Sequence, residues 1–121
     1  MHQRDQAHGR ALVVWRDLER RRARLATTNL VLGESHGLIA RRLGARTGLG
    51  FLSTLTGSAG PRVIWADEEL TLAAIGQWLA RHQERQWSVV DAVSFEVMHR
   101  EGIERAFAFD QDFELAGFAL L

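Results

Sequence analysis

The strongest constraint on the fold is the alternation of short apolar runs with longer segments of helical periodicity. Short apolar runs are expected to form strands at 23–27, 63–66, 106–109 and 118–120. Longer segments, with apolar residues three and four apart, are expected to form helices at 7–22, 29–43, 47–55, 68–85, 88–100 and 111–116. Strands that alternate with helices favour a mostly parallel sheet with helices on both faces, which is a three-layer α/β/α architecture.

The segment 68–85 carries the clearest helical signal. Asp67 stands before it in a position suited to an N-cap. Leu72, Ile75 and Leu79 follow at spacings of three and four, so we expect them to face the core.

Length and composition restrict the class of protein. A chain of 121 residues is expected to form a single domain over 1–121. It has no cysteine, which excludes disulfides and thiolate chemistry. No apolar run approaches the roughly 18 residues of a membrane span, so we expect a cytoplasmic protein that does not engage a membrane. Net charge is zero and every basic residue is arginine, so charge alone does not indicate a nucleic-acid binder.

Glu34 departs from the ordinary pattern of a helix. It is expected to share a helix face with Leu30 and Leu38, four residues away on either side. A charge among apolar neighbours costs several kcal/mol unless it is paired or bound to a metal. An ion pair with Arg41 or Arg42 is the simpler explanation, and a metal site is the other.

Three aspartates also stand at the starts of helices. Asp91 shares a face with Phe95 and follows Ser88 at the spacing of a capping box, so it fits either a cap or a ligand. Asp110 ends one predicted strand, where it is equally suited to an N-cap. Asp112 falls in the first turn of the next helix.

Parallel sheets collect ligands beyond the carboxyl ends of their strands, where these acids would meet. Gathered carboxylates repel one another unless a hard divalent cation lies among them, and Mg²⁺ or Mn²⁺ suits such ligands. A cation of this kind acidifies water and offsets charge on a phosphate, as in hydrolytic nucleases. The five histidines show no metal-ligand spacing, and Trp87 is expected to anchor the core rather than to stack on a base.

Three stretches of the sequence resemble the PIN domain of VapC-type toxins. They are QAHGRALVVWRDLERR near the start, TTNLVLGE at 27–34, and SVVDAVSFEVMHREGIERAFAFDQDFELAGF at 88–118. The resemblance covers nearly the whole chain in the family's order, and its C-terminal third is the most specific part.

By position, the resemblance makes Glu34, Asp91 and Asp110 the second, third and fourth acids of the family's metal site. Asp112 is a further candidate ligand, because it stands where many relatives carry histidine. Thr28 and Ser88 match polar positions that support the acids.

The sequence departs from the family pattern at its beginning. Family members start with an apolar strand that ends in an aspartate and lies at the centre of the sheet. The resemblance therefore implies a sheet without its first, central strand and a site without its first acid. Asp5 matches a later loop position, where a helix cap is the simpler role. A misassigned start, a degenerate inactive relative, and a sheet completed by a second copy are the three explanations.

Two functions stay open. The resemblance implies a Mg²⁺- or Mn²⁺-dependent endoribonuclease, the toxin of a type II toxin–antitoxin system, with RNA as substrate, a small antitoxin as partner and a homodimer as its assembly. The alternative is a catalytically impaired, PIN-like binding module whose acidic site is incomplete.

Overall fold

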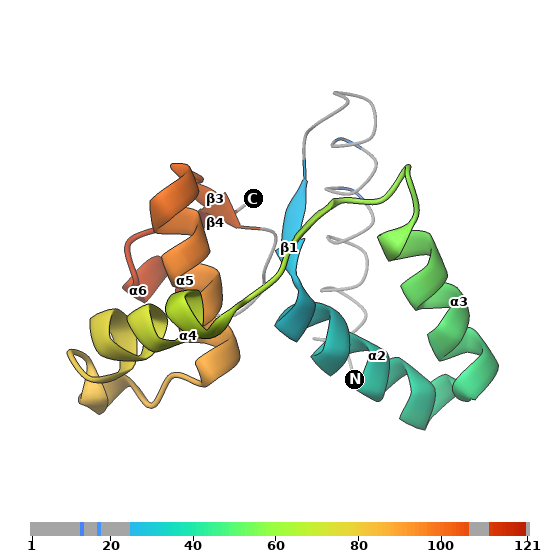
Figure 1. The fold of residues 1–121 in the computed structure, drawn as a ribbon, viewed down its shortest axis with the longest axis horizontal. Helices are drawn as coiled ribbons and strands as arrows, with labels where there is room; N and C mark the ends of the chain where they lie inside the picture. The colour runs from blue at the N-terminus through green and yellow to red at the C-terminus, as the bar shows by residue number, and fades with distance from the viewer. Residues whose placement is uncertain (1–12, 14–16, 18–24, 107–111, 121) are drawn as a thin grey trace. The chain divides into compact units, whose positions relative to one another are not determined.

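The computed structural model describes residues 13, 17, 25–106 and 112–120, drawn as coloured ribbon in Figure 1. The chain divides into two compact units. The larger unit spans Leu25–Ile103, and the smaller one comprises Met1–Arg24 and Glu104–Leu121. Of the predicted helix at 7–22, only residues 13 and 17 are described, and Asp5 lies outside the described residues.

The larger unit contains two strands and most of the described helices (Figure 1). Strand β1 (Ala26–Thr28) pairs in parallel with β2 (Arg62–Ile64), with Thr27 opposite Val63. The helical elements are α2 (Asn29–Leu43), α3 (Ala45–Thr56), α4 (Glu68–Ala74), the π-helix η1 (Ile75–Leu79), the 3₁₀ helix η2 (Gln83–Arg85) and α5 (Val89–Glu101).

The smaller unit contains a second parallel pair of strands. Strand β3 (Arg105–Ala106) pairs with β4 (Ala119–Leu120), and the short helix α6 (Asp112–Leu115) lies between them in the sequence. Gly117 has φ 101°, a left-handed conformation that glycine adopts without strain, and it ends the helix where the sequence predicted.

The strands confirm the predicted parallel pairing. All four predicted strands are present, although β1 and β2 lie a residue or more from the expected bounds and 107–109 falls outside the described residues. Among the described residues they form two separate two-stranded sheets, β1–β2 and β3–β4. Within the part of the chain that the structure describes, each strand of such a pair has one edge without a hydrogen-bonded neighbour.

The core of the larger unit lies between α4 and α5. Its buried apolar residues are Leu70, Ala74, Ala92, Val93 and Val97. Leu30 of α2 and Ile64 of β2 pack against this cluster. Strand β2 and helices α2, α4 and α5 therefore share one hydrophobic core.

The predicted core face of α4 was wrong in part. Leu72 is 59% exposed and Ile75 is 37% exposed, whereas Leu70 and Ala74 are buried. Residues 70 and 74 are four apart and share one helix face, and residue 72 is rotated about 200° from either of them. The predicted core positions are therefore wrong for Leu72 and Ile75 and confirmed for Leu79, which packs against the core.

The predicted helix 68–85 was also too long. Regular α-helix ends at Ala74, and η1 follows with a wider turn in which the Ala80 N–H donates to the Ile75 carbonyl at 2.9 Å. This wider turn places both Trp78 and Leu79 against the core. Gln86 then adopts a left-handed conformation (φ 56°), which turns the chain into α5.

The predicted helix boundaries are confirmed where side chains cap helices. Thr28 Oγ1 accepts from the Val31 N–H at 3.2 Å, and Asp67 Oδ1 accepts from the Leu70 N–H at 2.8 Å. Gly102, in a left-handed conformation (φ 68°), ends α5. These local signals depend on only a few neighbouring residues, so the sequence is sufficient to place them.

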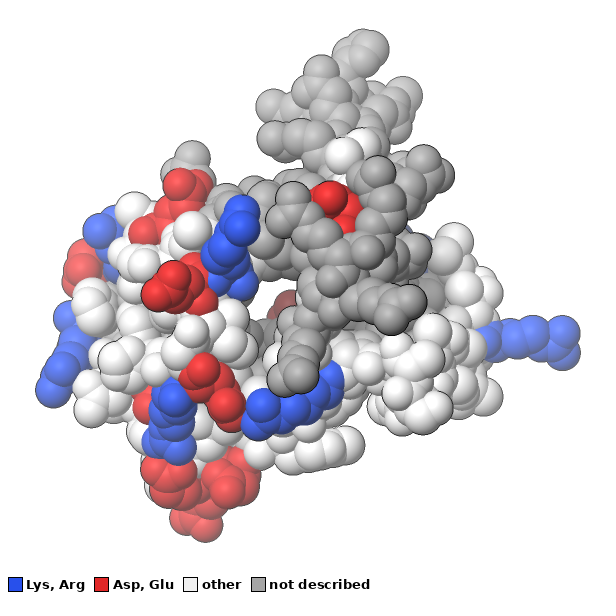
Figure 2. All heavy atoms as spheres, turned by 90° about the horizontal axis from the view of Figure 1, so that it is seen from above, with Lys and Arg blue, Asp and Glu red and all other residues white. Residues whose placement is uncertain are grey.

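Charge is distributed unevenly over the larger unit. In Figure 2 acidic and basic side chains lie close together toward the α4–α5 part, whereas the α3 part is mostly uncharged. Helix α3 has the sequence ARTGLGFLSTLT and exposes Leu49. Within the described part of the chain, no helix is long and apolar enough to cross a membrane.

Candidate metal centre and its surroundings

Glu34 lies in the second turn of α2, which begins directly after β1. Its side chain is exposed, and Leu38 on the same face is itself 43% exposed. The expected desolvation of this carboxylate is therefore not found. Within the described ranges Glu34 also makes no ion pair, so the expected pairing with Arg41 or Arg42 is absent. The carboxylate is solvated and available to a ligand.

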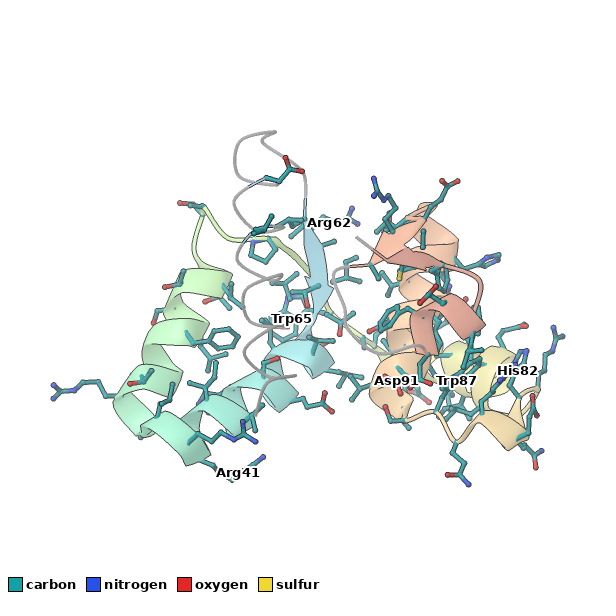
Figure 3. All side chains as sticks on the ribbon, turned by 180° about the vertical axis from the view of Figure 1, so that it is seen from behind. Arg41, Arg62, Trp65, His82, Trp87 and Asp91 are labelled. Atoms are coloured by element: carbon teal, nitrogen blue, oxygen red, sulfur yellow. The ribbon has the colours of Figure 1, made fainter. Side chains whose placement is uncertain are left out.

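Asp91 is the third residue of α5 and forms the predicted capping box with Ser88. The Ser88 N–H donates to Asp91 Oδ2 at 3.0 Å, and the Asp91 N–H donates to Ser88 Oγ at 3.1 Å. This exchange fixes the half-buried carboxylate at the first turn of α5 (Figure 3). It uses one carboxylate oxygen, and Oδ1 has no hydrogen-bond partner among the described residues. Capping and metal binding are therefore compatible at this residue.

The remaining acids belong to the smaller unit. Asp112 is the first residue of α6, with a half-buried side chain and a backbone carbonyl that accepts from the Ala116 N–H at 2.9 Å. Asp110 lies outside the described residues. The structure thus places Glu34 on α2 and Asp91 on α5 of the larger unit, and their joint role as ligands stays a prediction, as do the candidate ligands of the smaller unit.

The donor chemistry of the described acids fits a hard divalent cation. Within the described part of the chain, Glu34 and Asp91 offer carboxylate oxygens that form no ion pair with arginine, and Mg²⁺ and Mn²⁺ prefer carboxylate ligands. Over residues 25–106 and 112–120, no group of three histidine, aspartate or glutamate side chains is close enough to hold a metal. A complete ligand set would therefore need a side chain outside these ranges, and Asp110 stays the predicted one.

Asn29 fixes the start of α2 in a way that the sequence pattern did not indicate. Thr28, and not Asn29, is the N-cap residue of α2. Asn29 Oδ1 instead accepts from the Ala66 N–H at 2.7 Å. This bond ties the chain after β2 to the start of the helix that carries Glu34, beside the exposed Trp65 labelled in Figure 3.

A buried polar network between α4, η1 and α5 was missed by sequence reasoning. Glu96 is only 6% exposed; its Oε1 accepts from Trp78 Nε1 at 3.0 Å and its Oε2 from Arg100 Nε at 2.7 Å. Arg100 also donates both terminal nitrogens to the Glu69 carboxylate, at 2.7 and 2.8 Å. In the sequence, the one signal that could have indicated this network is the i,i+4 spacing of Glu96 and Arg100.

The charges in this network perturb one another. Hydrogen bonding from Arg100, with its positive charge, holds the pKa of Glu69 below its ordinary value, although partial desolvation opposes the shift. Hydrogen bonds to Glu69 and Glu96 raise the pKa of Arg100. The Glu69–Arg100 pair therefore stays charged near neutral pH and joins the first turn of α4 to the last turns of α5.

An aromatic cluster covers the same helices. Trp87 is 7% exposed and packs edge-on against Phe95, with ring centroids 5.0 Å apart. This confirms Trp87 as a core anchor. Trp78 stacks on His82 at 6.1 Å with an interplanar angle of 25°.

A pocket of about 470 Å³ opens beside this cluster. Its lining residues come from η1, the segment that follows η1, and α5; they are Gln77, Trp78, Arg81, His82, Glu96 and His99. Neither Glu34 nor Asp91 lines it.

No family model matches the chain. The chain is 40% identical over 114 residues to the 23S rRNA-specific endonuclease VapC20 of two Mycobacterium tuberculosis strains, which covers 94% of this chain and 83% of that protein. It is also similar to the crystal structure of Mycobacterium tuberculosis VapC20, described as a Sarcin-Ricin loop cleaving toxin. That match has a TM-score of 0.74 at 39% identity and covers 86% of this chain and 79% of that one. The chain therefore has the α/β fold of this relative.

Proposed function

The chain belongs to the VapC-type family of PIN-domain toxin ribonucleases, and from this membership we propose that it is a metal-dependent endoribonuclease, the toxin of a type II toxin–antitoxin system. The observation that carries the proposal is 40% identity over 94% of the chain to a ribosomal-RNA endonuclease. The solvated Glu34 and the Asp91 oxygen that has no partner among the described residues also support it, because both side chains can accept a cation.

We assign the divalent cation to Glu34, Asp91 and Asp110, with Asp112 as a further candidate. When bound, Mg²⁺ or Mn²⁺ supplies positive charge that acidifies water and offsets negative charge on a phosphate. The protein's own contribution is the placement of its carboxylates. Ser88 holds Asp91 through the capping box, and Thr28 together with Asn29 fixes the start of the helix that presents Glu34.

The substrate class follows from the relative. Its description as a sarcin–ricin loop cleaving toxin leads us to propose a structured ribosomal RNA hairpin as the substrate of this chain. RNA recognition of this kind depends largely on shape and on unpaired loop bases rather than on an acid motif.

The test is cleavage of an end-labelled RNA hairpin with the sarcin–ricin loop sequence, with and without Mg²⁺ or Mn²⁺. Asp91→Asn retains an oxygen that can accept from the Ser88 N–H, so the helix cap survives while the ligand charge is lost. We expect cleavage to fall at least roughly 10- to 100-fold, and Glu34→Gln to behave likewise.

Asp67→Asn is the matched control, because Asp67 is also an aspartate whose carboxylate caps a helix, from the N-cap position of α4, and it has no assigned ligand role. Cleavage that continues in EDTA, or that Asp67→Asn impairs as much as Asp91→Asn, would contradict the proposal.

A catalytically impaired binding module is the second candidate, favoured by the absence of a three-acid group among the described residues. Hairpin binding without cleavage in either cation would support it. A small antitoxin partner and a homodimer belong to the leading proposal. Light scattering of the purified chain, alone and with a candidate antitoxin, tests both assemblies, and a strict monomer would contradict the dimer.

A further inference from the structure

The pocket beside η1 lies away from the candidate metal ligands of the larger unit. In Figure 3 Asp91 is at the start of α5, and His82 lies beyond Trp87 on the other side of the aromatic cluster. The pocket volume of about 470 Å³ falls within the roughly 300–1,000 Å³ typical of ligand sites. It is therefore a separate candidate site on the same unit.

The π-helix η1 builds the pocket wall. Gln77 and Trp78 belong to η1, and Arg81 and His82 follow it directly. π-helical turns are rare and are frequently found at functional sites, because the extra residue per turn costs regular hydrogen bonding. In this chain the turn and the segment directly after it carry four of the six lining residues, two each.

The charge balance of the pocket favours an anion. Glu96 lines it, but both of its carboxylate oxygens already accept hydrogen bonds, from Trp78 and Arg100. Arg81 makes no ion pair with any described residue. His99 is exposed at the pocket, and its imidazole adds a second nitrogen group beside the Arg81 guanidinium. A guanidinium with an imidazole nearby is suited to a phosphate.

The aromatic lining distinguishes a nucleotide from a simple anion. Trp78 and His82 form a nearly parallel stack, and His82 is held in place by the contact of its Nδ1 with the Trp78 carbonyl at 3.1 Å. Because a carbonyl only accepts, Nδ1 carries a proton. Flat aromatic surfaces beside a cationic group are the elements that bind single-stranded RNA, with the base on the ring and the phosphate on the cation.

We propose that the pocket between η1 and α5 is a second RNA-binding site that holds one nucleotide of the substrate strand, with its phosphate on Arg81 and His99 and its base against Trp78 and His82. This inference rests on the proposed ribonuclease function. The site anchors the RNA away from the cleavage centre, and its residues take no part in bond breaking.

Binding in EDTA tests the site without cleavage. A short fluorescein-labelled single-stranded RNA is titrated with the protein and followed by fluorescence anisotropy. We expect Arg81→Gln to weaken binding about five- to tenfold and to reduce the slope of log K against log salt by about 0.7. His99→Gln is expected to act in the same direction. Arg85→Gln is the matched control, because Arg85 is an exposed arginine four residues away that does not line the pocket.

A second measurement locates the nucleotide. In a ¹H–¹⁵N spectrum, the indole N–H signal of Trp78 is assigned by its loss in Trp78→Phe. We expect this signal to shift when the same single-stranded RNA, without fluorescein, is added. The exposed Trp65 is the internal control and should move less. AMP and inorganic phosphate serve as parallel probes that separate an RNA strand from a free nucleotide or a free phosphate.

Any one of three results would overturn the proposal. The first is that Arg81→Gln and Arg85→Gln weaken RNA binding equally, and the second is that RNA does not shift the Trp78 signal. The third is that an oligo-glutamate peptide displaces the RNA at a similar concentration. These outcomes differ from failure of the proposed function. Metal-dependent cleavage with an indifferent Arg81 refutes only the pocket, whereas Arg81-dependent RNA binding without cleavage refutes only the ribonuclease.

Discussion

Glu96 provides the sharpest test of how the larger unit is held together. Its buried carboxylate accepts the indole N–H of Trp78 at 3.0 Å and the Arg100 Nε–H at 2.7 Å. Replacement by methionine keeps similar length and helix propensity but removes both acceptor oxygens. The substitution therefore removes the carboxylate oxygen that accepts from the half-buried indole N–H, while Arg100 still contacts Glu69 at the surface.

The expected cost follows from these contacts. A buried donor left without an acceptor costs about 1–3 kcal/mol, and the lost hydrogen bonds of a charged acceptor add to it. We expect Glu96→Met to lower the free energy of unfolding by about 2–4 kcal/mol. For a chain of this length, the melting temperature would fall by roughly 3–6 °C per kcal/mol.

A double-mutant cycle in urea separates this bond from general packing. Trp78→Phe removes the donor, so in that background Glu96→Met leaves no unpaired indole, and the penalty should fall by about 1–3 kcal/mol. If Glu96→Met costs the same in both backgrounds, within about 0.5 kcal/mol, then the indole–carboxylate bond does not stabilise the unit as described.

Three further predictions concern stability. The pKa of Glu69 is lowered in the folded state, so its contribution to the free energy of unfolding is fully present above the ordinary pKa of 4.5 and is lost as pH falls through the folded-state pKa. The difference in urea midpoint between the wild type and Glu69→Gln should therefore be largest near neutral pH and vanish in acid. A pH-independent difference would contradict the pairing with Arg100. Gly60→Ala should destabilise the chain by more than about 1 kcal/mol in the same assay, because a Cβ there would overlap the Leu55 carbonyl and lie 2.9 Å from the Thr54 oxygen. Gly33→Ala, which meets nothing within 4 Å in the middle of α2, should stabilise it by about 0.5–1 kcal/mol; equal effects at the two glycines would refute the steric argument.

Local signals in the sequence were sufficient for most element boundaries. Thr28, Asp67, Ser88 and Gly102 each start or end a helix through contacts with residues three or four positions away, so their roles follow from neighbouring letters. The alternation of strands and helices likewise predicted parallel pairing, which both sheets confirm.

Features that depend on contacts distant in the sequence were not predictable in this way. The widened turn at Ile75–Leu79 brings Trp78 within reach of Glu96, 18 positions later, and no local pattern encodes that contact. The pairing of Glu69 with Arg100 spans 31 positions.

Among the candidate ligands, the local argument for Glu34 assumed that neighbouring leucines bury it. Leu38 is instead exposed, so the carboxylate is solvated. The sequence identified Glu34 and Asp91 as unusual, but their shared role came from the family resemblance rather than from periodicity. That role, together with those of Asp110 and Asp112, stays a prediction.

The most direct test of that role is calorimetric titration of the full chain with Mn²⁺. If Glu34, Asp91 and Asp110 share one ion, the wild type will bind Mn²⁺, and each of Glu34→Gln, Asp91→Asn and Asp110→Asn will weaken binding at least roughly tenfold, while Asp67→Asn will not. Wild-type affinity in any one of the three ligand variants would contradict the shared site.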